Sequence, residues 1–85
     1  MRYTVICHPS AQDDLARIWI QASDRQAVAD AADAMEQWLK RSPETVGTPV
    51  NHGPERCLVM DPLVMIFTVH PEDCFVRIAK IRLVD

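Results

Sequence analysis

The sequence has few glycines and no long apolar run. Only two of its 85 residues are glycine, which leaves little room for flexible linkers. A transmembrane helix needs about 20 consecutive apolar residues, and no stretch of this sequence approaches that length. A chain of this size has the length of one domain. We therefore predict a single domain over residues 1–85, with no membrane-spanning segment.

A basic excess is also missing. Nine basic residues stand against twelve acidic ones, which gives a formal net charge of -3. Proteins that bind nucleic acid through its phosphates usually carry a strong positive excess. We therefore expect no strong direct binding to nucleic acid, and the charge favours a protein as the target. Net charge does not exclude a local basic face, so the positions of the cations decide.

The three cysteines predict reduced thiols. Cys7, Cys57 and Cys74 cannot all pair, and no two of them form a Cys-x-x-Cys motif. Unpaired thiols are typical of cytosolic proteins. Since the chain begins directly with a strand pattern at Tyr3, without a secretory signal, we expect a cytoplasmic protein. No cysteine and histidine spacing matches a zinc pattern, so we expect no metal and no other cofactor.

The first half of the chain predicts a strand and the start of a helix. Tyr3–His8 alternates between two faces, and its β-branched and aromatic residues favour a strand. Pro9 ends this strand because proline cannot donate to a ladder. Ser10 and Asp13 have the spacing of a capping box, which predicts a helix running to about Ala22.

A second, alanine-rich helix is expected from about Asp24 to Arg41. Ser23 and Gln26 repeat the capping-box spacing at its start. Because one or two residues join the helices, we predict an antiparallel hairpin. Each helix carries an apolar stripe at steps of three and four residues. Trp19 and Trp38 lie on these stripes, and we interpret them as core anchors.

Residues 44–54 predict a loop with a short extended piece at Thr48–Val50. Residues 55–85 then predict three consecutive strands, which break at Asp61-Pro62 and at residues 70–73. The order β-α-α-β-β-β indicates an α+β fold, in which the helical hairpin covers one face of an antiparallel sheet. The first strand is expected beside the last strand or at an edge.

The last strand does not alternate cleanly. One extra residue near Ala79-Lys80 would separate its apolar and basic residues onto two faces, so we predict a β-bulge there. Arg77, Lys80 and Arg82 would then form one outward basic row. Arg56, at the start of the first closing strand, is a candidate neighbour of this row. The residues expected to point inward are Val76, Ile78, Ile81 and Leu83.

The basic row has two interpretations. It could bind phosphate or an acidic partner surface, because positioned cations stabilise a phosphorane-like charge. It could instead be a solvated strand face whose charges protect a sheet edge. His8, His52 and His70 are candidates for a general acid or base, a role for which proteins use histidine most often. Each lies beside a proline or glycine at the end of an element, which favours turn residues.

The order of several short motifs resembles the RelE/ParE toxin superfamily of bacterial type II toxin–antitoxin modules. The resemblance covers nearly the whole chain. It implies a small toxin that is neutralised by a cognate antitoxin. The matching motifs are Tyr3-x-Val5, Pro9-x-Ala11, Leu15-x-x-Ile18-Trp19, Leu39 followed by Pro43 and Gly47, Gly53-x-x-Arg56, Pro62-Leu63-x-x-x-Phe67-x-Val69 and Val76-x-Ile78-x-x-Ile81.

Two branches of this superfamily differ in their target. RelE-like members cleave mRNA in the ribosome with basic residues and a tyrosine on the sheet, and ParE-like members act on DNA gyrase. The RelE-type pattern has lysines where this chain has Val59 and Asp61, and an arginine where it has Val64. Beyond Tyr3 the chain has no tyrosine. The resemblance thus favours a ParE-like toxin that binds a protein target such as DNA gyrase without catalysis, and Arg56 is the residue carried over from it.

Two alternatives stay open. The first is a ribosome-dependent mRNA endonuclease of the RelE type, for which the basic row is the motivating feature. The second is a non-toxic interaction module that retains the fold, for which the negative charge is the motivating feature. The candidate residues for binding a target or partner are Arg56, Arg77, Lys80 and Arg82.

Overall fold

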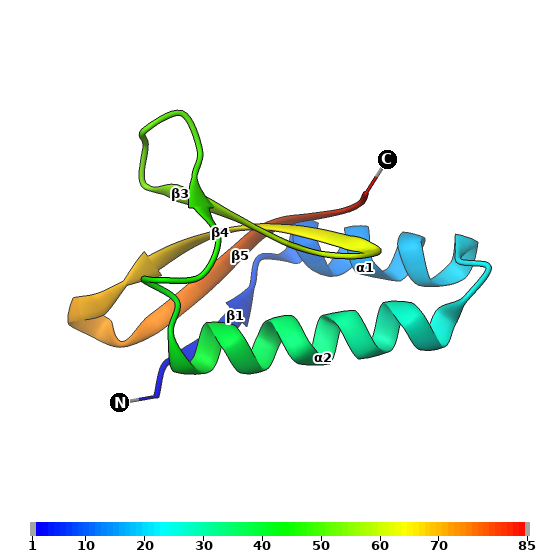
Figure 1. Ribbon diagram of the computed structural model, residues 1–85, viewed down its shortest axis with the longest axis horizontal. Coiled ribbons are helices and arrows are strands. Elements are labelled where there is room, and N and C mark those ends of the chain that lie inside the picture. Colours follow the sequence, from blue (N-terminus) through cyan, green and yellow to red (C-terminus); the bar gives the residue numbers. More distant parts are fainter. Residues whose placement is uncertain (1, 85) are drawn as a thin grey trace.

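The computed structural model describes residues 2–84, which form two helices and a five-stranded sheet (Figure 1). The predicted α+β class and the helical hairpin are confirmed, and so is the short extended piece at Thr48. The elements are, in chain order, β1 (Thr4–Cys7), α1 (Pro9–Gln21), α2 (Arg25–Arg41), β2 (Thr48–Pro49), β3 (Glu55–Met60), β4 (Leu63–His70), the 3-10 turn η1 (Pro71–Asp73) and β5 (Phe75–Leu83).

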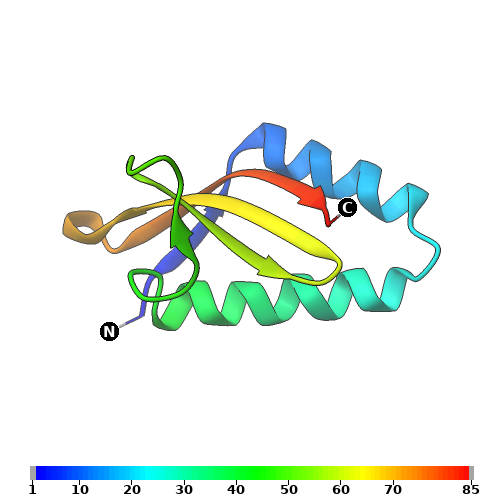
Figure 2. The same ribbon diagram turned by 45° about the horizontal axis from the view of Figure 1, so that its top comes forward.

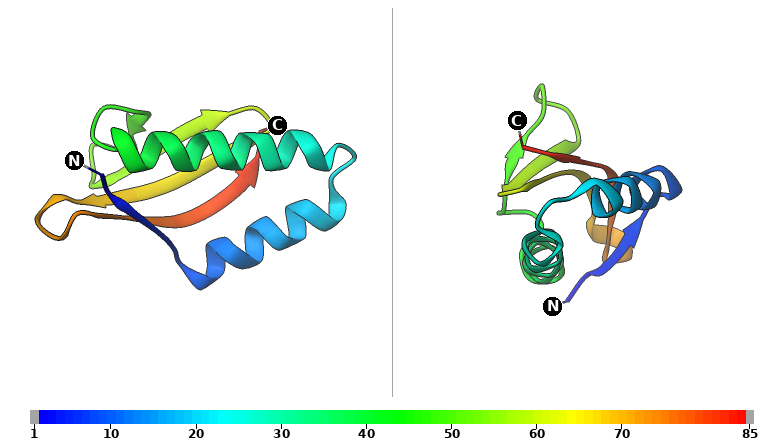
Figure 3. Two further views of the ribbon diagram at one scale, coloured as in Figure 1. Left: turned by 90° about the horizontal axis from the view of Figure 1, so that it is seen from below. Right: turned by 90° about the vertical axis from the view of Figure 1, so that its right-hand side faces the viewer.

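The sheet is mixed, with the strand order β1-β5-β4-β3-β2. The three closing strands form the expected antiparallel meander, and β2 extends it on the β3 side. The first strand β1 is both at an edge and beside the last strand, where it pairs parallel with β5 (Figure 2). Figure 3 shows that α2 and α1 lie on the same side of the sheet and leave its other face without a helix.

The core lies between the helices and one face of the sheet. Phe67 of β4 and Val76 of β5 are fully buried there, and Met35 and Leu39 of α2 are equally inaccessible from the helix side. Burying a side chain of this size contributes about 1.5–3 kcal/mol, so these few residues supply much of the stability of a small domain.

The prediction that the two tryptophans anchor the core is wrong. Trp19 is 42% exposed and Trp38 is 46% exposed. Each is next in the sequence to a buried residue, Ile18 or Leu39, and successive residues of a helix point about 100° apart. The sheet covers only a narrow sector of each helix, so the tryptophans at the margin of the apolar stripe lie partly in solvent.

Helix α1 begins two residues earlier than predicted. Its N-cap is His8, whose Nδ1 accepts a hydrogen bond of 3.1 Å from the backbone N–H of Ser10. Pro9 occupies the first helical turn, where the missing N–H has no cost. The prediction of Ser10 as the N-cap is therefore wrong, and its hydroxyl lies 2.9 Å from His8 Nδ1 and 3.2 Å from the carbonyl oxygen of Ala79.

Helix α2 also begins with a different cap from the one predicted. The carboxylate of Asp24, not the hydroxyl of Ser23, accepts a 3.1 Å hydrogen bond from the N–H of Ala27. The side chain of Gln26 bonds to Asp30 instead of completing a capping box. Residues 22–24 thus form the connection between the helices, one residue longer than the longer of the two lengths expected.

Substitution of neighbouring residues in α2 tests this account of the core. Leu39→Ala is expected to lower the free energy of unfolding by about 2–5 kcal/mol, because Leu39 is fully buried. Trp38→Ala is expected to cost less than half of that, since Trp38 is nearly half exposed. Urea titration followed by circular dichroism measures both values. A larger loss at Trp38 than at Leu39 would contradict the observed orientation of α2.

Candidate functional site

The predicted bulge in β5 is present. Phe67 of β4 lies opposite Ile78. The preceding residue, Ile66, lies opposite Lys80, so Ala79 has no partner residue in β4. The inserted residue resets the alternation of the strand. The apolar residues before and after it therefore stay on the helix-covered face.

The bulge leaves three cations on the outer face of the sheet, which is the face turned away from the helices. Arg77, Lys80 and Arg82 lie opposite outward-facing residues of β4, and all three are exposed. None of them forms an ion pair with any of residues 2–84. We call these three residues the basic row. The structure thus brings together three of the four predicted site residues.

A stack of side chains extends the basic row toward the turn between β4 and β5. The rings of His70 and Phe75 are stacked, with centroids 4.3 Å apart and an angle of 11° between their planes. The guanidinium of Arg77 lies 5.9 Å from the centroid of Phe75 on the same face. His70 Nε2 is 3.0 Å from the hydroxyl of Thr68, which orients the imidazole. The turn interpretation of His70 missed this placement, although its period-two spacing with Thr68 carried the signal.

An apolar groove lies between α1 and α2. Its volume is about 610 Å³. Ile20, on its α1 side, is 70% exposed and is the most exposed of the large apolar residues in the described part of the chain. The sequence pattern does not predict this groove, because it indicates a core position for Trp19, which lines the groove. The groove is lined by Cys7, Gln12, Leu15, Ala16, Trp19, Ile20, Val28, Ala29, Ala32 and Asp33.

The thiol at the base of this groove is not a reactive group. Cys7 points toward the helices from β1, and burial raises the pKa of its thiol, with a smaller effect from the charge of Glu36. The nucleophilic form of cysteine is the thiolate. Cys7 therefore stays protonated at neutral pH and acts as a small apolar side chain of the groove.

Comparison with known proteins identifies the fold. No family model and no curated protein matches the sequence. The toxin–antitoxin complex RelBE2 from Mycobacterium tuberculosis matches with a TM-score of 0.82 and 19% identity, over 99% of this chain and 93% of that chain. The chromosomal ParDE system from P. aeruginosa matches with a TM-score of 0.75 and 16% identity, over 99% and 98% of the two chains. The chain has the fold of the RelE/ParE toxins.

A third structure with this fold supports the same assignment. The YoeB dimer from Staphylococcus aureus has a TM-score of 0.67 and 16% identity, with 100% of both chains covered. The fold expected from the short sequence motifs is therefore confirmed. At identities of 16% to 19%, these comparisons show the RelE/ParE fold alone. The activity has to be argued from the residues of the site.

Arg56, the fourth predicted site residue, lies away from the basic row. It pairs with Phe67, so its side chain is on the helix-covered face. Its guanidinium donates three hydrogen bonds of 3.0–3.2 Å to the carbonyls of Val46 and Gly47. Gly47 has a φ of +72°, and a Cβ there would lie 2.3 Å from the carbonyl oxygen of Cys57. Within the RelE/ParE fold, Arg56 thus fastens the segment after α2 to β3, and its role in target binding stays a prediction.

The single tyrosine of the chain also has a structural contact in this RelE/ParE fold. The hydroxyl of Tyr3 donates to the carboxylate of Glu44, and this hydrogen bond raises the pKa of Tyr3 to about 12. The phenol is therefore neutral at physiological pH and remains a donor. The backbone N–H of Tyr3 donates to the carbonyl of Lys40 over 2.8 Å. Together these bonds tie β1 to the end of α2.

The other histidines lie at the ends of elements, as expected. His8 caps α1, and His52 sits in a turn with a φ of 59°. Within residues 2–84, no group of three or more His, Cys, Asp or Glu residues is placed to hold a metal ion. Neither α1 nor α2 has the length and apolar content to cross a membrane.

The different environments of Arg56 and Arg82 predict effects of different size on stability when each arginine is replaced. Arg56→Gln is expected to lower the free energy of unfolding by about 1.5–3 kcal/mol, since it removes charge-assisted bonds to two partly buried carbonyls. Arg82→Gln, on the exposed row, is the matched control and should change stability by less than about 0.5 kcal/mol. Denaturant unfolding of both variants measures the difference. Equal effects would mean that Arg56 does not hold the 42–54 segment.

Proposed function

We propose that this protein is the toxin of a bacterial toxin–antitoxin module and that a cognate antitoxin neutralises it in the cytoplasm. One observation carries the proposal: the RelE/ParE fold extends over the whole described chain. The RelBE2 complex and the ParDE system, which share this fold, are toxin–antitoxin systems. Cys7 and Cys57 are free thiols, which suits a reducing compartment.

For the target, we propose a ParE-like mode in which the outer face binds a protein such as DNA gyrase and inhibits it without catalysis. Among residues 2–84 the basic row has no counter-ion, so its charges are available to an acidic surface. Exposed apolar residues flank it on the same face, among them Ile6 at 45% and Val59 at 56%. Such a mixture of apolar area and arginine is typical of protein–protein interfaces. The net charge of -3 disfavours bare nucleic acid as the target.

We assign the groove between α1 and α2 to the antitoxin. It offers an apolar channel between two helices, into which an amphipathic helix can lay its apolar face. Asp33 lies in its lining, and Glu36 lines the depression that continues from it. Neither lining contains a lysine or arginine. An antitoxin segment with apolar anchors and basic residues beside them is therefore complementary to this surface.

A second candidate function is the ribosome-dependent mRNA endonuclease. The observation that favours it is the position of His70, which shares the outer face with the basic row. A histidine can accept a proton from a ribose hydroxyl at neutral pH. Cations beside it can stabilise the charge that develops on the phosphate.

Growth assays test the toxin proposal. Expression of the chain alone in a bacterium is expected to arrest growth, and co-expression of the adjacent small reading frame is expected to restore it. Replacement of Arg77, Lys80 and Arg82 by glutamine should abolish the arrest while the protein stays folded. Normal growth of the strain that makes the unmutated protein at a detectable level would refute the toxin proposal.

The same assay locates the antitoxin. Ala16→Lys places an ammonium group in the groove, where it repels the basic residues of the proposed antitoxin segment, and should weaken antitoxin binding by about tenfold or more, so that the adjacent frame no longer rescues growth. Gln37→Lys, on the exposed face of α2, adds the same charge outside the groove and should leave rescue intact. Equal rescue of both variants would place the antitoxin elsewhere.

Purified protein distinguishes the two targets. A ParE-like toxin is expected to inhibit DNA supercoiling by gyrase and to leave mRNA intact in a translating extract. His70→Ala should not change that inhibition. If mRNA is cleaved in the extract and His70→Ala slows the cleavage by about 100-fold or more, the endonuclease is the function. Activity in neither assay would reject both targets, and normal growth in the expression assay as well would favour the non-toxic module.

A further inference from the structure

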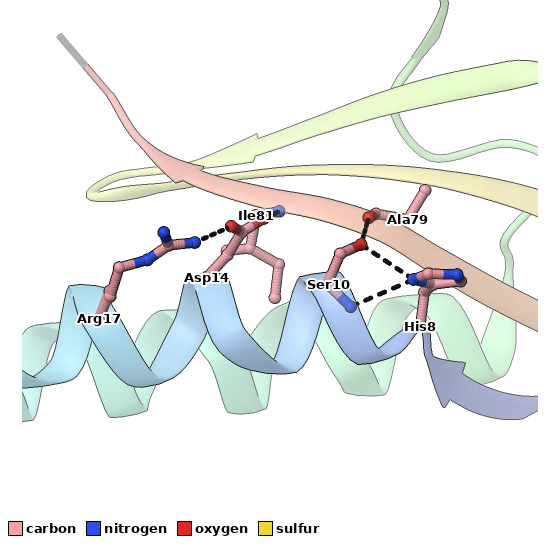
Figure 4. Close-up of polar contacts among 6 residues, drawn as sticks. All are labelled: His8, Ser10, Asp14, Arg17, Ala79 and Ile81. Atoms are coloured by element: carbon pink, nitrogen blue, oxygen red, sulfur yellow. Dashed lines mark hydrogen bonds and ion pairs between the residues drawn. The ribbon is translucent and has the colours of Figure 1, made fainter.

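The edge of β5 changes its neighbour at the bulge. Pairing with β1 covers only Phe75–Ile78 of β5. The last backbone bond along this edge runs from the N–H of His8 to the carbonyl of Ile78, at 2.9 Å. Beyond this point helix α1, which starts directly after His8, lies along β5 in place of a strand (Figure 4).

Two side chains of α1 bond to the backbone of the bulged segment. The hydroxyl of Ser10 donates to the carbonyl of Ala79 over 3.2 Å, and the N–H of Ile81 donates to Oδ2 of Asp14 over 3.2 Å (Figure 4). The other carboxylate oxygen of Asp14 is held by Arg17 at 2.7 Å. The side chain of Asp14 is 18% exposed, so it is partly shielded from water. Helix α1 therefore supplies partners for backbone groups of β5 beyond Ile78, where pairing with β1 ends.

The bulge is needed only because Ala79 is present: a chain without this residue would turn the same charges outward by strict alternation. Without Ala79, strict alternation would still place Ile78 and Ile81 on the inner face and Lys80 between them on the outer face. What the extra residue adds is a bend, a stronger local twist and a longer chain path between Arg77 and the other two cations. Its effect is thus on the spacing and direction of the basic row.

We propose that Ser10 and Asp14 are positioning residues, which fix the bulge and thereby set Lys80 and Arg82 in the arrangement that the target requires. The proposal rests on the proposed function, in which the basic row contacts the target. The two residues act through the backbone of Ala79 and Ile81 and do not touch the target themselves. The hydroxyl of Ser10 lies between the capping residue, 2.9 Å from His8 Nδ1, and β5, 3.2 Å from the carbonyl oxygen of Ala79.

Deletion of Ala79 is the most direct test. The deleted chain keeps the alternation of its apolar residues, so it is expected to fold with a helix and strand content equal to that of the unmutated protein. Its growth-arresting activity should fall by about tenfold or more, because the geometry of three charges changes at once. A deletion variant that is folded and fully active would overturn the proposal.

Side-chain variants test the two residues separately, and they carry the test if the deletion variant does not fold. Asp14→Ala should accelerate amide hydrogen exchange at Ile81 by about tenfold, since the N–H loses its acceptor. Asp14→Asn keeps an acceptor oxygen and should restore both the slow exchange and the activity. Ser10→Ala and Ser10→Thr form the corresponding pair for the carbonyl of Ala79, and their readout is growth arrest. Asp13→Ala, one residue away and exposed, is the control.

The exchange measurement separates this proposal from the proposed function. If the unmutated protein does not arrest growth, the toxin proposal fails, and NMR spectra still decide whether α1 positions the row. Changes in the resonances of Lys80 and Arg82 in Asp14→Ala, reversed in Asp14→Asn, would support the positioning role. Unchanged exchange at Ile81 and unchanged row resonances in Asp14→Ala would overturn it. Full toxicity of the double variant Ser10→Ala/Asp14→Ala would also overturn the proposal if the resonances of Lys80 and Arg82 were shifted. The target would then not require the native arrangement of these two residues.

Discussion

The pairing of β4 with β5 is the interaction on which both faces of the sheet depend. It places Phe67 and Ile78 side by side in the core and turns Arg77 outward from the next position. Because side chains alternate with a period of two, a slip by one residue would exchange the two faces. The guanidinium would then be buried without a partner, at a cost of several kcal/mol. The register is therefore strongly specified, and the bulge is the one place where it changes.

The same constraint explains which parts of the structure the sequence predicts. The bulge is predictable because basic and apolar residues cannot share a buried face, so the pattern around Ala79 has one simple solution. The helical hairpin follows from apolar periodicity and a short connection. The width of the buried sector on each helix does not follow from periodicity, since it depends on how the helices sit on the sheet. For that reason periodicity predicts Trp19 and Trp38 in the core and does not predict the groove between the helices.

In the candidate site too, some residues are placed by the pattern of one strand and others by contacts between segments far apart in the sequence. The basic row belongs to one strand, so alternation with a single inserted residue is enough to assemble it. Arg56 and His70 depend on pairing between strands, which a single sequence does not contain. The register places Arg56 on the inner face, where the carbonyls of Val46 and Gly47 accept hydrogen bonds from its guanidinium. It places His70 on the outer face beside Phe75. Contacts such as that of Ser10 with Ala79 join residues 69 positions apart and carry no local signal.

The distribution of charge gives the molecule two different surfaces. Strand β5 carries three cations and no anion, while the charged residues that line the helical groove and its continuation, Asp33 and Glu36, are acidic. The net charge of -3 hides this separation, because the acidic residues elsewhere outnumber the row. Opposite charges on two surfaces orient an approaching partner before contact, since the field of each surface attracts a different sign. The basic antitoxin segment and the acidic target surface that we propose would therefore bind to different faces of one small domain. Helix α1 lines the groove and also bonds to the bulged segment of β5. A segment bound in the groove would therefore contact the same helix that we propose positions the basic row.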